Sequence, residues 1–192
     1  RLLPETRERA QYYPYRKTLD LEPGHYQARL VVHDRRGGAV GSVAHDLEVP
    51  SLDEWRVASP VLTDAFTTGN GGAPQLMLVA RREFPAAGKL LCSLETYGAA
   101  LDPSTGTSRV LLSYVLRRGS EELARGGPQA LGPIPGEALG ATFGLPLEAL
   151  ATGDYELELQ FLEDVRGQRK ALHERFTVTA VPSEPSGPPP SR

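Results

Sequence analysis

One short pattern occurs twice in the sequence, at a constant offset of 129 residues. LEPGHYQARLVVHD in the first part of the chain aligns without a gap with LATGDYELELQFLED in the last part. The offset, 155 − 26 = 129, pairs Tyr26 with Tyr155 and Gly24 with Gly153. It also pairs Leu21 with Leu150, Leu30 with Leu159, Gly38 with Gly167, Val49 with Val178, and Leu47 with Phe176. A repeat that keeps both its turn residues and its apolar spacing indicates a duplicated structural element.

Apolar and polar residues alternate within each copy. The second copy places on one side Tyr155, Leu157, Leu159 and Phe161, and on the other Glu156, Glu158 and Gln160. The first copy does the same with Tyr26, Ala28, Leu30 and Val32 against Gln27, Arg29 and His33. A period of two predicts strands with one face on a core and one in solvent. The Gly-containing turns and the returning segments SVAHDLEV and ALHERFTV make each copy a β-hairpin.

A glycine stands two residues before the tyrosine that opens each hairpin. The pairs are Gly24 with Tyr26 and Gly153 with Tyr155. The spacing resembles the tyrosine corner of immunoglobulin-like Greek-key sandwiches, in which the hydroxyl bonds to backbone a few residues upstream. We therefore expect these four residues to be structural and not catalytic.

The segments between the two copies also predict strands. They are PQLMLVARR, GKLLCSLETYG, SRVLLSYVLRRG with Val110, Leu112, Tyr114 and Leu116 on one face, and GATFGLPLEAL, which we expect to cross between sheets. No long segment has a period of 3.6 residues. The expected fold is all-β, with tandem immunoglobulin-like Greek-key β-sandwiches.

The strands are unevenly distributed along the chain. Residues 51–181 hold enough of them for a complete sandwich. Residues 1–50 predict only three, in QYYPYRKTLDL, HYQARLVVHD and GSVAHDLEV, too few to bury a stable core. We expect the rest of this first domain to lie upstream, in a longer protein of which this chain is a piece, or to come from a partner. The Pro- and Ser-rich residues 182–192 predict a disordered tail.

Composition excludes several classes of function. A net charge of −3 gives no basic patch for nucleic acid. No apolar run is long enough to span a bilayer. The single cysteine, Cys92, rules out an internal disulfide and a cysteine-rich zinc site.

Catalytic and metal signatures are missing from the sequence, so we expect no cofactor and no enzyme activity. His33 and His45 would approach each other across the first hairpin, but the usual zinc spacings are absent. The carboxylate pairs Glu121–Glu122 and Glu163–Asp164 fall at predicted turns, where we expect solvated tips and not the pocket that acid–base work requires.

The best candidates for a binding surface are aromatic. Tyr12, Tyr13 and Tyr15 surround a proline, and Trp55 lies in the predicted hinge VPSLDEW. Exposed aromatic rings stack on sugars or hold proline-rich peptides. Packing is the favoured interpretation, with Tyr13 or Tyr15 in the sandwich and Trp55 in the inter-domain junction, because large aromatic side chains are mostly buried in folded proteins.

Most of the chain resembles the region that follows the von Willebrand factor type A domain in a group of bacterial exported proteins. The counterparts are Pro23-Gly24-His25-Tyr26, His33-Asp34, Gly41-Ser42 and Val49-Pro50-Ser51-Leu52. REFPAAGKLLCSLETYGA and the second hairpin are similar to that family's terminal β-domain. DPSTGTS departs from the metal loop of the type A domain because Gly106 replaces its second serine. The resemblance implies an extracytoplasmic location, periplasmic or secreted.

These observations predict a non-enzymatic structural or protein-interaction module of an exported bacterial protein. We expect a protein partner, bound by sheet-edge pairing or within a larger assembly. The alternative is a carbohydrate-binding accessory module that uses exposed tyrosine and tryptophan side chains on a glycan. An enzyme is the weakest of the three hypotheses.

Overall fold

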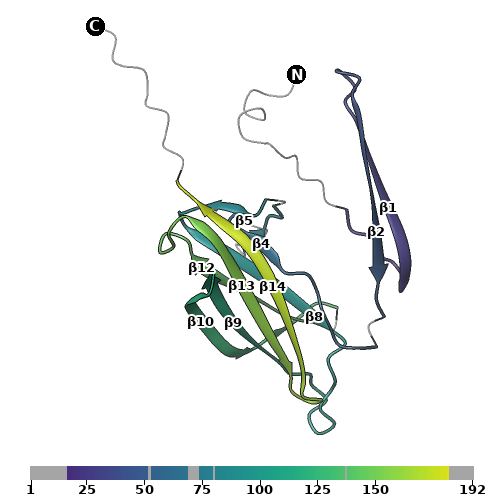
Figure 1. Cartoon of the computed structure of the whole chain (residues 1–192). Coiled ribbons are helices and arrows are strands. Elements are labelled where there is room, and N and C mark those ends of the chain that lie inside the picture. Colours follow the sequence, from purple (N-terminus) through teal and green to yellow (C-terminus); the bar gives the residue numbers. More distant parts are fainter. Residues whose placement is uncertain (1–16, 52, 69–73, 80, 137, 182–192) are drawn as a thin grey trace. The chain divides into compact units, whose positions relative to one another are not determined.

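The computed structural model describes residues 17–51, 53–68, 74–79, 81–136 and 138–181. All regular secondary structure in these ranges is β, and none of it is helical. The chain divides into two compact units, one spanning residues 15–54 and one whose described part runs from residue 55 to residue 181 (Figure 1). The expected all-β fold class is confirmed, while the proposed disordered tail lies outside the described residues.

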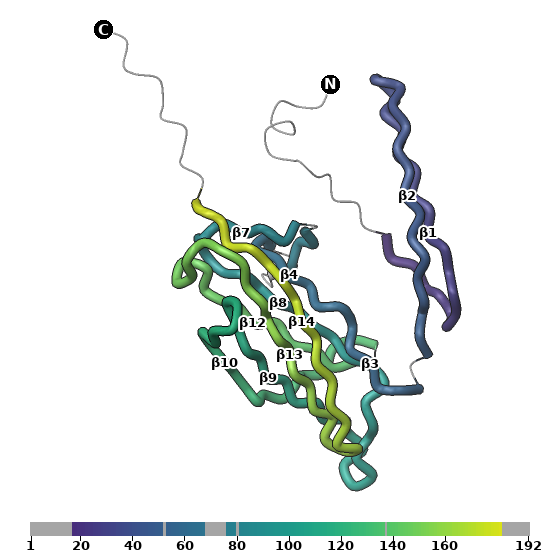
Figure 2. The backbone as a smooth tube through the Cα atoms, viewed as in Figure 1, coloured from purple at the N-terminus to yellow at the C-terminus, as the bar shows by residue number. Residues whose placement is uncertain are grey.

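The first unit is a single hairpin. Strand β1 (Gly24–His33) pairs antiparallel with β2 (Val40–Val49) over ten residues, as the two neighbouring tube segments in Figure 2 show. The sequence also predicts a strand in QYYPYRKTLDL. This prediction is wrong for residues 17–21, which lie outside any strand, and the first six residues of the segment are outside the described ranges. A strand needs a hydrogen-bonded neighbour, and residues 17–21 have no described ladder to join.

The second unit is a β-sandwich. Its larger sheet has the strand order β10-β9-β13-β14-β7. Neighbours are antiparallel except β7 and β14, which are parallel. The bounds are β7 (Glu83–Pro85), β9 (Val110–Arg118), β10 (Glu121–Ala130), β13 (Gly153–Glu163) and β14 (Gln168–Thr179).

The smaller sheet has the order β11-β12-β8-β3, and β4 also pairs with β8. Its bounds are β3 (Arg56–Val57), β4 (Val61–Thr63), β8 (Lys89–Tyr97), β11 (Gly132–Ile134) and β12 (Ala138–Pro146). The predicted crossing in GATFGLPLEAL is made by its second half, since residues 147–152 lead from β12 to β13 in the other sheet.

The strand predicted in PQLMLVARR is mostly wrong. Only β6 (Pro74–Leu76) forms there, and it pairs with β5 (Phe66–Thr68) in a separate two-stranded sheet. The carbonyl of Met77 accepts a hydrogen bond from the Thr63 hydroxyl at 2.6 Å instead of joining a ladder. The side chains of Met77 and Leu78 are exposed, while Val79 of the same run is partly buried against the core.

The core lies between the two sheets of the sandwich. Alternate residues of β9 point into it as the sequence predicts: Val110, Leu112 and Leu116 are buried, and Tyr114 is partly buried. The facing sheet contributes Leu90, Cys92, Leu94 and Leu145. Packing of these two apolar layers is the main stabilising term of the unit.

Candidate functional site

The two hairpins of the repeat have the same pairing register. Tyr26 lies opposite Leu47, and Tyr155 lies opposite Phe176, so both partners are related by the offset of 129 residues (47 + 129 = 176). The agreement extends from the glycine that opens the first strand of each hairpin to the end of its second strand. The repeat in the sequence is therefore a repeat of three-dimensional structure.

The turns of the two hairpins also correspond. Gly38 has a φ of 71° and Gly167 a φ of 65°, a left-handed conformation that favours glycine. A carboxylate opens each turn and accepts backbone amides. Asp34 accepts the amide of Arg36 at 2.9 Å, and this bond together with one from the next amide lowers the pKa of Asp34. Two residues thus fix one turn geometry in both copies.

Glu163 has the same position in the second turn. Its carboxylate accepts the amides of Val165 at 3.2 Å and Arg166 at 2.8 Å, and its side chain is fully buried. The expectation of a solvated tip is wrong for Glu163, because the carboxylate points back to satisfy the backbone of its own turn. Sequence reasoning missed this role, although the acidic residue four positions before a turn glycine in both copies is a signal for it.

Each tyrosine hydroxyl donates to the carbonyl four residues upstream. Tyr155 bonds to Ala151 at 2.6 Å, and Tyr26 bonds to Glu22 at 2.8 Å. Tyr155 is buried and its ring stacks on Phe176 with centroids 5.6 Å apart. This is the hydrogen-bond pattern that a tyrosine corner requires.

The backbone conformation two residues before Tyr155 favours glycine, and a larger side chain there would also displace the guanidinium of Arg118. Gly153 has a φ of 144°, and a Cβ there would lie 2.9 Å from a guanidinium nitrogen of Arg118. That guanidinium donates to the carbonyl of Thr152 at 2.8 Å. Gly24, the equivalent residue of the first hairpin, has a φ of 159°.

The two hairpins differ in what covers their apolar faces. Leu159 and Phe161 are 0% and 2% exposed, because the smaller sheet packs on them. Their equivalents in the first hairpin, Leu30 and Val32, are 45% and 62% exposed. Val43, on the same face of β2, is exposed too. Within the described part of the chain, the apolar face of β1–β2 is uncovered, and this makes it the main candidate for an interaction surface.

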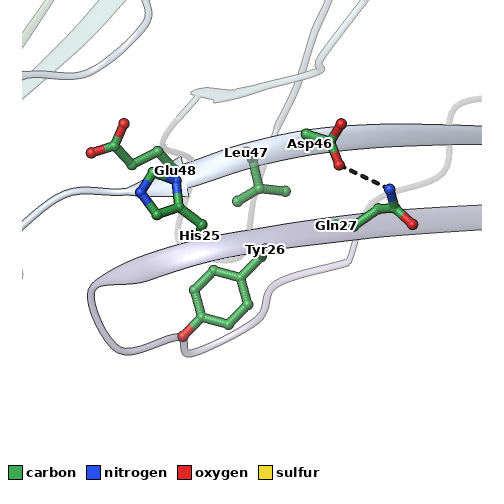
Figure 3. A pocket seen from close by; sticks show the side chains of 6 residues that line it. All are labelled: His25, Tyr26, Gln27, Asp46, Leu47 and Glu48. Carbon is green, nitrogen blue, oxygen red and sulfur yellow. Dashed lines mark hydrogen bonds between the residues drawn. The ribbon is translucent and has the colours of Figure 1, made fainter.

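One end of this hairpin has an open hollow with a volume of about 520 Å³. Its lining residues, shown in Figure 3, are His25, Tyr26, Gln27, Asp46, Leu47 and Glu48. The amide of Gln27 donates to Asp46 across the two strands at 2.9 Å. Among the described residues, the two strands of the ribbon alone line this hollow, and it is open to solvent.

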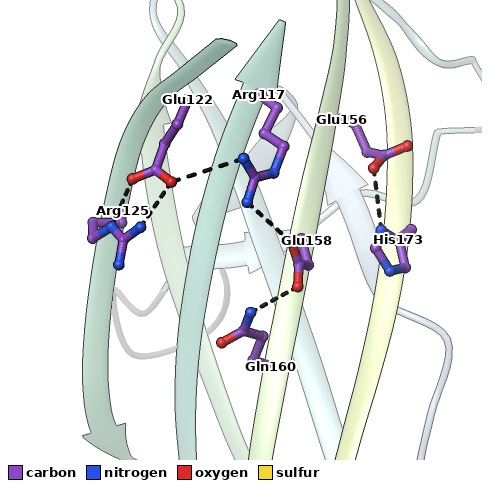
Figure 4. A network of polar contacts seen from close by, with 7 residues as sticks. All are labelled: Arg117, Glu122, Arg125, Glu156, Glu158, Gln160 and His173. Atoms are coloured by element: carbon purple, nitrogen blue, oxygen red, sulfur yellow. Dashed lines mark hydrogen bonds and ion pairs between the residues drawn. The ribbon is translucent and has the colours of Figure 1, made fainter. Parts of the chain in front are cut away.

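A second polar surface lies on the outer face of the larger sheet. The guanidinium of Arg117 lies 3.8 Å from a carboxylate oxygen of Glu122 and 3.6 Å from one of Glu158 (Figure 4). Arg125 binds Glu122 at 2.6 Å, and this hydrogen bond is the main cause of the lowered pKa of Glu122. Glu122, which the sequence places at a solvated turn, is therefore an ion-paired carboxylate on the surface. Such ion pairs are ordinary features of protein surfaces and favour a structural role over a catalytic one.

Glu156 forms a similar contact further along the same face. Arg175 and His173 each lie 3.2 Å from one of its carboxylate oxygens. These hydrogen bonds, that of Arg175 first, hold the pKa of Glu156 below its ordinary value of 4.5. Beside this network lies a shallow groove of about 590 Å³, to which β9, β10, β13 and β14 contribute Leu111, Ser113, Pro128, Glu158, Gln160, Phe161, Leu162, Arg169, Lys170 and Ala171.

The expected approach of His33 and His45 is wrong. His33 lies opposite Val40, and His45 lies opposite Ala28. The two histidines are therefore offset by five residues along the ribbon, about 17 Å at the usual strand rise. Among the described residues, no group of three or more His, Cys, Asp or Glu side chains is arranged to hold a metal ion.

Trp55 is not part of an exposed aromatic binding surface. Trp55 is 2% exposed, its indole nitrogen donates to the Thr96 hydroxyl at 2.6 Å, and the Lys170 ammonium lies 5.1 Å from the ring centroid. As a surface-binding candidate Trp55 is wrong, because its ring fills the sandwich core. The other three candidates, Tyr12, Tyr13 and Tyr15, lie outside the described residues.

Cys92 is the single thiol of the chain. It is buried in the core, and burial raises its pKa to about 12. A thiol of this kind stays protonated and does not act as a nucleophile.

Comparisons with known proteins do not assign the chain to a family. A scan against protein-family models finds no match, and neither does a search of curated proteins. None of the described segments forms a helix long and apolar enough to cross a membrane.

Proposed function

We propose that the chain is a non-enzymatic structural or protein-interaction module of an exported bacterial protein, and that β1–β2 is the part of it that is covered by other β-strands. One observation carries the proposal. The two hairpins agree in register, turn and tyrosine hydrogen bond, yet within the part of the chain that the structure describes only β13–β14 has its apolar face buried.

Exposed apolar side chains on one face of a ribbon give a driving force for association. Leu30, Val32 and Val43 project from the same face and are each 45% exposed or more. Burying a Val or Leu side chain completely contributes about 1.5–3 kcal/mol, so three half-exposed side chains offer several kcal/mol in total. Monomeric proteins rarely leave such a patch without a use.

The strand order supports an immunoglobulin-like arrangement for the sandwich. Its two sheets, β11-β12-β8-β3 and β10-β9-β13-β14-β7, follow the A-B-E-D and C-F-G grouping of that fold. In this correspondence Tyr155 opens strand F at the E–F corner. The equivalent strands β1 and β2 would then correspond to strands F and G of such a sandwich.

The resemblance to proteins with a von Willebrand factor type A domain supports an extracytoplasmic role. One motif that carries it, Pro23-Gly24-His25-Tyr26, forms a bend at Pro23 and the first residues of β1. It serves the fold of the hairpin, which agrees with a structural role for this part of the chain. A protein partner, and not a glycan, fits the uncovered face, because the buried Trp55 no longer offers a ring for sugar stacking.

Hydroxyl-radical footprinting tests the proposal. Val31 and Val32 are 58% and 62% exposed but project from opposite faces of β1, so they form a matched pair. We expect Leu30 and Val32 to be protected in the bacterium that exports the protein and reactive in the purified chain, while Val31 stays reactive in both. Equal reactivity of Leu30 and Val32 in the two samples would refute the proposed function.

A further inference from the structure

We infer that the chain binds a second copy of itself head to tail. In this contact β2 of one copy adds as an antiparallel strand to the open edge of β1 of the next copy, and Arg29 of β1 pairs with Asp46 of the added strand. The inference rests on the protein-interaction role proposed above and deepens it by naming the partner and the strands that meet.

The edges of the β1–β2 ribbon are long and regular. Its two strands have ten residues each and pair in an unbroken register, and neither of them contains a proline. Within the described chain β1 and β2 pair only with each other, so each keeps one side without a neighbouring strand. An unpaired edge of this kind is a template for a further strand.

The strands at the ends of the two sandwich sheets are different. β3, β7 and β11 have only two or three residues each. β10 is longer, but its register against β9 shifts between Glu122 and Ala124 and again between Gly126 and Gln129, and its Pro128 has no amide to donate. Short or irregular end strands resist the addition of another strand. The ribbon is therefore the better place for pairing between copies.

The second hairpin shows that this backbone design takes a strand beside its first strand. β13 is hydrogen-bonded to β14 on one side and to β9 on the other. The β9 ladder covers Glu156–Glu163 of β13. Subtracting the offset of 129 places the equivalent ladder on Gln27–Asp34 of β1. The added strand therefore has a defined position.

Charge indicates which strand fits at this position. On the face of the ribbon that carries Gln27, β1 has Arg29 as its one arginine or lysine and has no carboxylate. On the same face β2 has Asp46 and Glu48, and neither arginine nor lysine. Like charges that face each other across a strand pair are destabilising, and opposite charges are stabilising. Two β1 edges would share only arginines and two β2 edges only carboxylates, whereas β1 beside β2 joins opposite charges.

Neither side chain of the proposed pair has an ionic partner among the described residues. The guanidinium of Arg29 makes a long hydrogen bond, 3.4 Å, to the side-chain oxygen of Gln27. The amide nitrogen of Gln27 donates to Oδ1 of Asp46 at 2.9 Å (Figure 3). A guanidinium from a neighbouring copy would therefore bind Oδ2 of Asp46.

Pairing Arg29 with Asp46 also aligns the apolar faces of the two copies. Within the hairpin the numbers of paired residues sum to 73 (27 + 46), and between the copies they would sum to 75 (29 + 46). This shift of two residues keeps every side chain on its own face, because strands have a period of two. It places Val32 opposite Val43 (32 + 43 = 75), and both of these side chains are exposed in the single copy. The ladder would hold the ion pair on one face and apolar pairs on the other.

The contact joins two different edges. Each copy offers β1 to one neighbour and β2 to another, so the interface is heterologous. Interfaces of this kind produce rings or filaments and not closed pairs. The assemblies should therefore grow as the concentration of the chain rises.

Sedimentation velocity of the 192-residue chain over a series of concentrations tests the inference. We expect species larger than a dimer at high concentration, and weaker association at about 1 M salt, where the screening length is only about 3 Å. Arg29→Glu places like charges opposite each other and should weaken association about tenfold. The matched control is Arg166→Glu, the same charge change in the exposed turn of β13–β14, which should leave association unchanged.

A variant with exchanged charges separates the ion pair from any effect of one substitution on folding. Arg29→Glu combined with Asp46→Arg restores opposite charges at the same two positions, with reversed sign. We expect this double variant to associate as the unchanged chain does, whereas each single variant associates more weakly. Sedimentation velocity at the same concentrations measures all three.

Each result decides one part of the inference. A chain that stays monomeric at every soluble concentration, or that stops at a dimer, would overturn the head-to-tail contact. Equal effects of Arg29→Glu and Arg166→Glu, or a double variant that does not regain association, would overturn the ion pair. The proposed function is decided separately: it stands if Leu30 and Val32 are protected in the bacterium and fails if they are not, whether or not the purified chain associates with itself.

Discussion

The hairpins β1–β2 and β13–β14 share their backbone design and differ in their surroundings. Both pair in the same register, both turn on a glycine with positive φ, and both tyrosine hydroxyls bond to a carbonyl four residues upstream. The apolar face of the second is buried in the sandwich core, whereas among the described residues the apolar side chains Leu30, Val32 and Val43 of the first are exposed. The difference teaches that hydrogen bonds and turn residues close in sequence fix the shape of a hairpin, whereas burial requires strands from elsewhere.

The outer faces of the two hairpins differ in charge. In the second, Glu156 on β13 binds Arg175 on β14. At the equivalent pair of the first, Gln27 on β1 binds Asp46 on β2. The acidic side chain has moved from the first strand to the second, while the register is unchanged. Cross-strand pairs can therefore exchange their polarity without altering the backbone.

The largest expected effect is a difference in cooperative unfolding between the two units. We expect Ser51–Val181 to unfold cooperatively as an isolated fragment, because it includes the whole described core. Arg1–Pro50 should show no cooperative transition, because a two-stranded hairpin with one exposed apolar face is at best marginally stable in water. Thermal melts followed by circular dichroism check both. A sharp transition in the shorter fragment would break the comparison between a covered and an uncovered hairpin.

Replacing the two equivalent leucines by alanine should reduce the stability of the protein by very different amounts. Leu159→Ala removes a fully buried side chain and should destabilise the chain by about 2–5 kcal/mol. Leu30→Ala, at the same position of the first hairpin, should change the unfolding free energy by less than about 0.5 kcal/mol, because the leucine is already 45% exposed. Urea denaturation of both variants gives the two values. Similar costs would mean that the two faces have the same environment.

The tyrosine hydroxyls give the next comparison. Tyr155→Phe should destabilise the sandwich by roughly 1–3 kcal/mol, because it leaves the carbonyl of Ala151 without its buried donor. Tyr26→Phe should have a smaller effect, since water reaches the carbonyl of Glu22. Melting temperatures of both variants test this. An unchanged melting temperature for Tyr155→Phe would argue against a stabilising role for that hydrogen bond.

The smallest effect is expected from pH. The hydrogen bond from Arg175 is the largest cause that holds the pKa of Glu156 below its ordinary value of 4.5, so the stability from that contact is present above pH 4.5 and is lost as the pH falls through the lowered value. Glu156→Gln, which reproduces the Gln27 of the first hairpin, should lose less stability over the same acid range. Urea midpoints measured at several pH values for both proteins supply the comparison. Equal acid sensitivity would show that the Glu156 contacts do not contribute.

Much of the sandwich could be predicted from sequence because its long strands alternate in period two. The inward residues of β9 and β13 follow from this period, and most of their neighbours on the outer face of β13 are polar, while β9 also has Leu111 and Val115 there. The failure at PQLMLVARR has a physical reason. Apolar composition alone does not distinguish a strand from an irregular segment, and the Thr63 hydroxyl takes the carbonyl of Met77 in place of a ladder partner.

The candidate site was less predictable from sequence. The uncovered face of β1–β2 follows from the uneven distribution of strands, and burial is the favoured interpretation of Trp55, but its place in the sandwich core and its partner are not predicted. Its indole finds a partner in Thr96, which is 41 residues away in sequence. The buried position of Glu163 was also missed, because an acidic residue at a turn normally faces solvent.

The sequence by itself determined the β class, the two hairpins and their turns, because alternation, glycine conformation and the tyrosine hydrogen bond act over a few residues. Only the tertiary structure decided which apolar face is buried, where Trp55 lies and how the surface carboxylates are paired. Those outcomes depend on contacts between strands distant in sequence, and such contacts form only when whole sheets pack against each other.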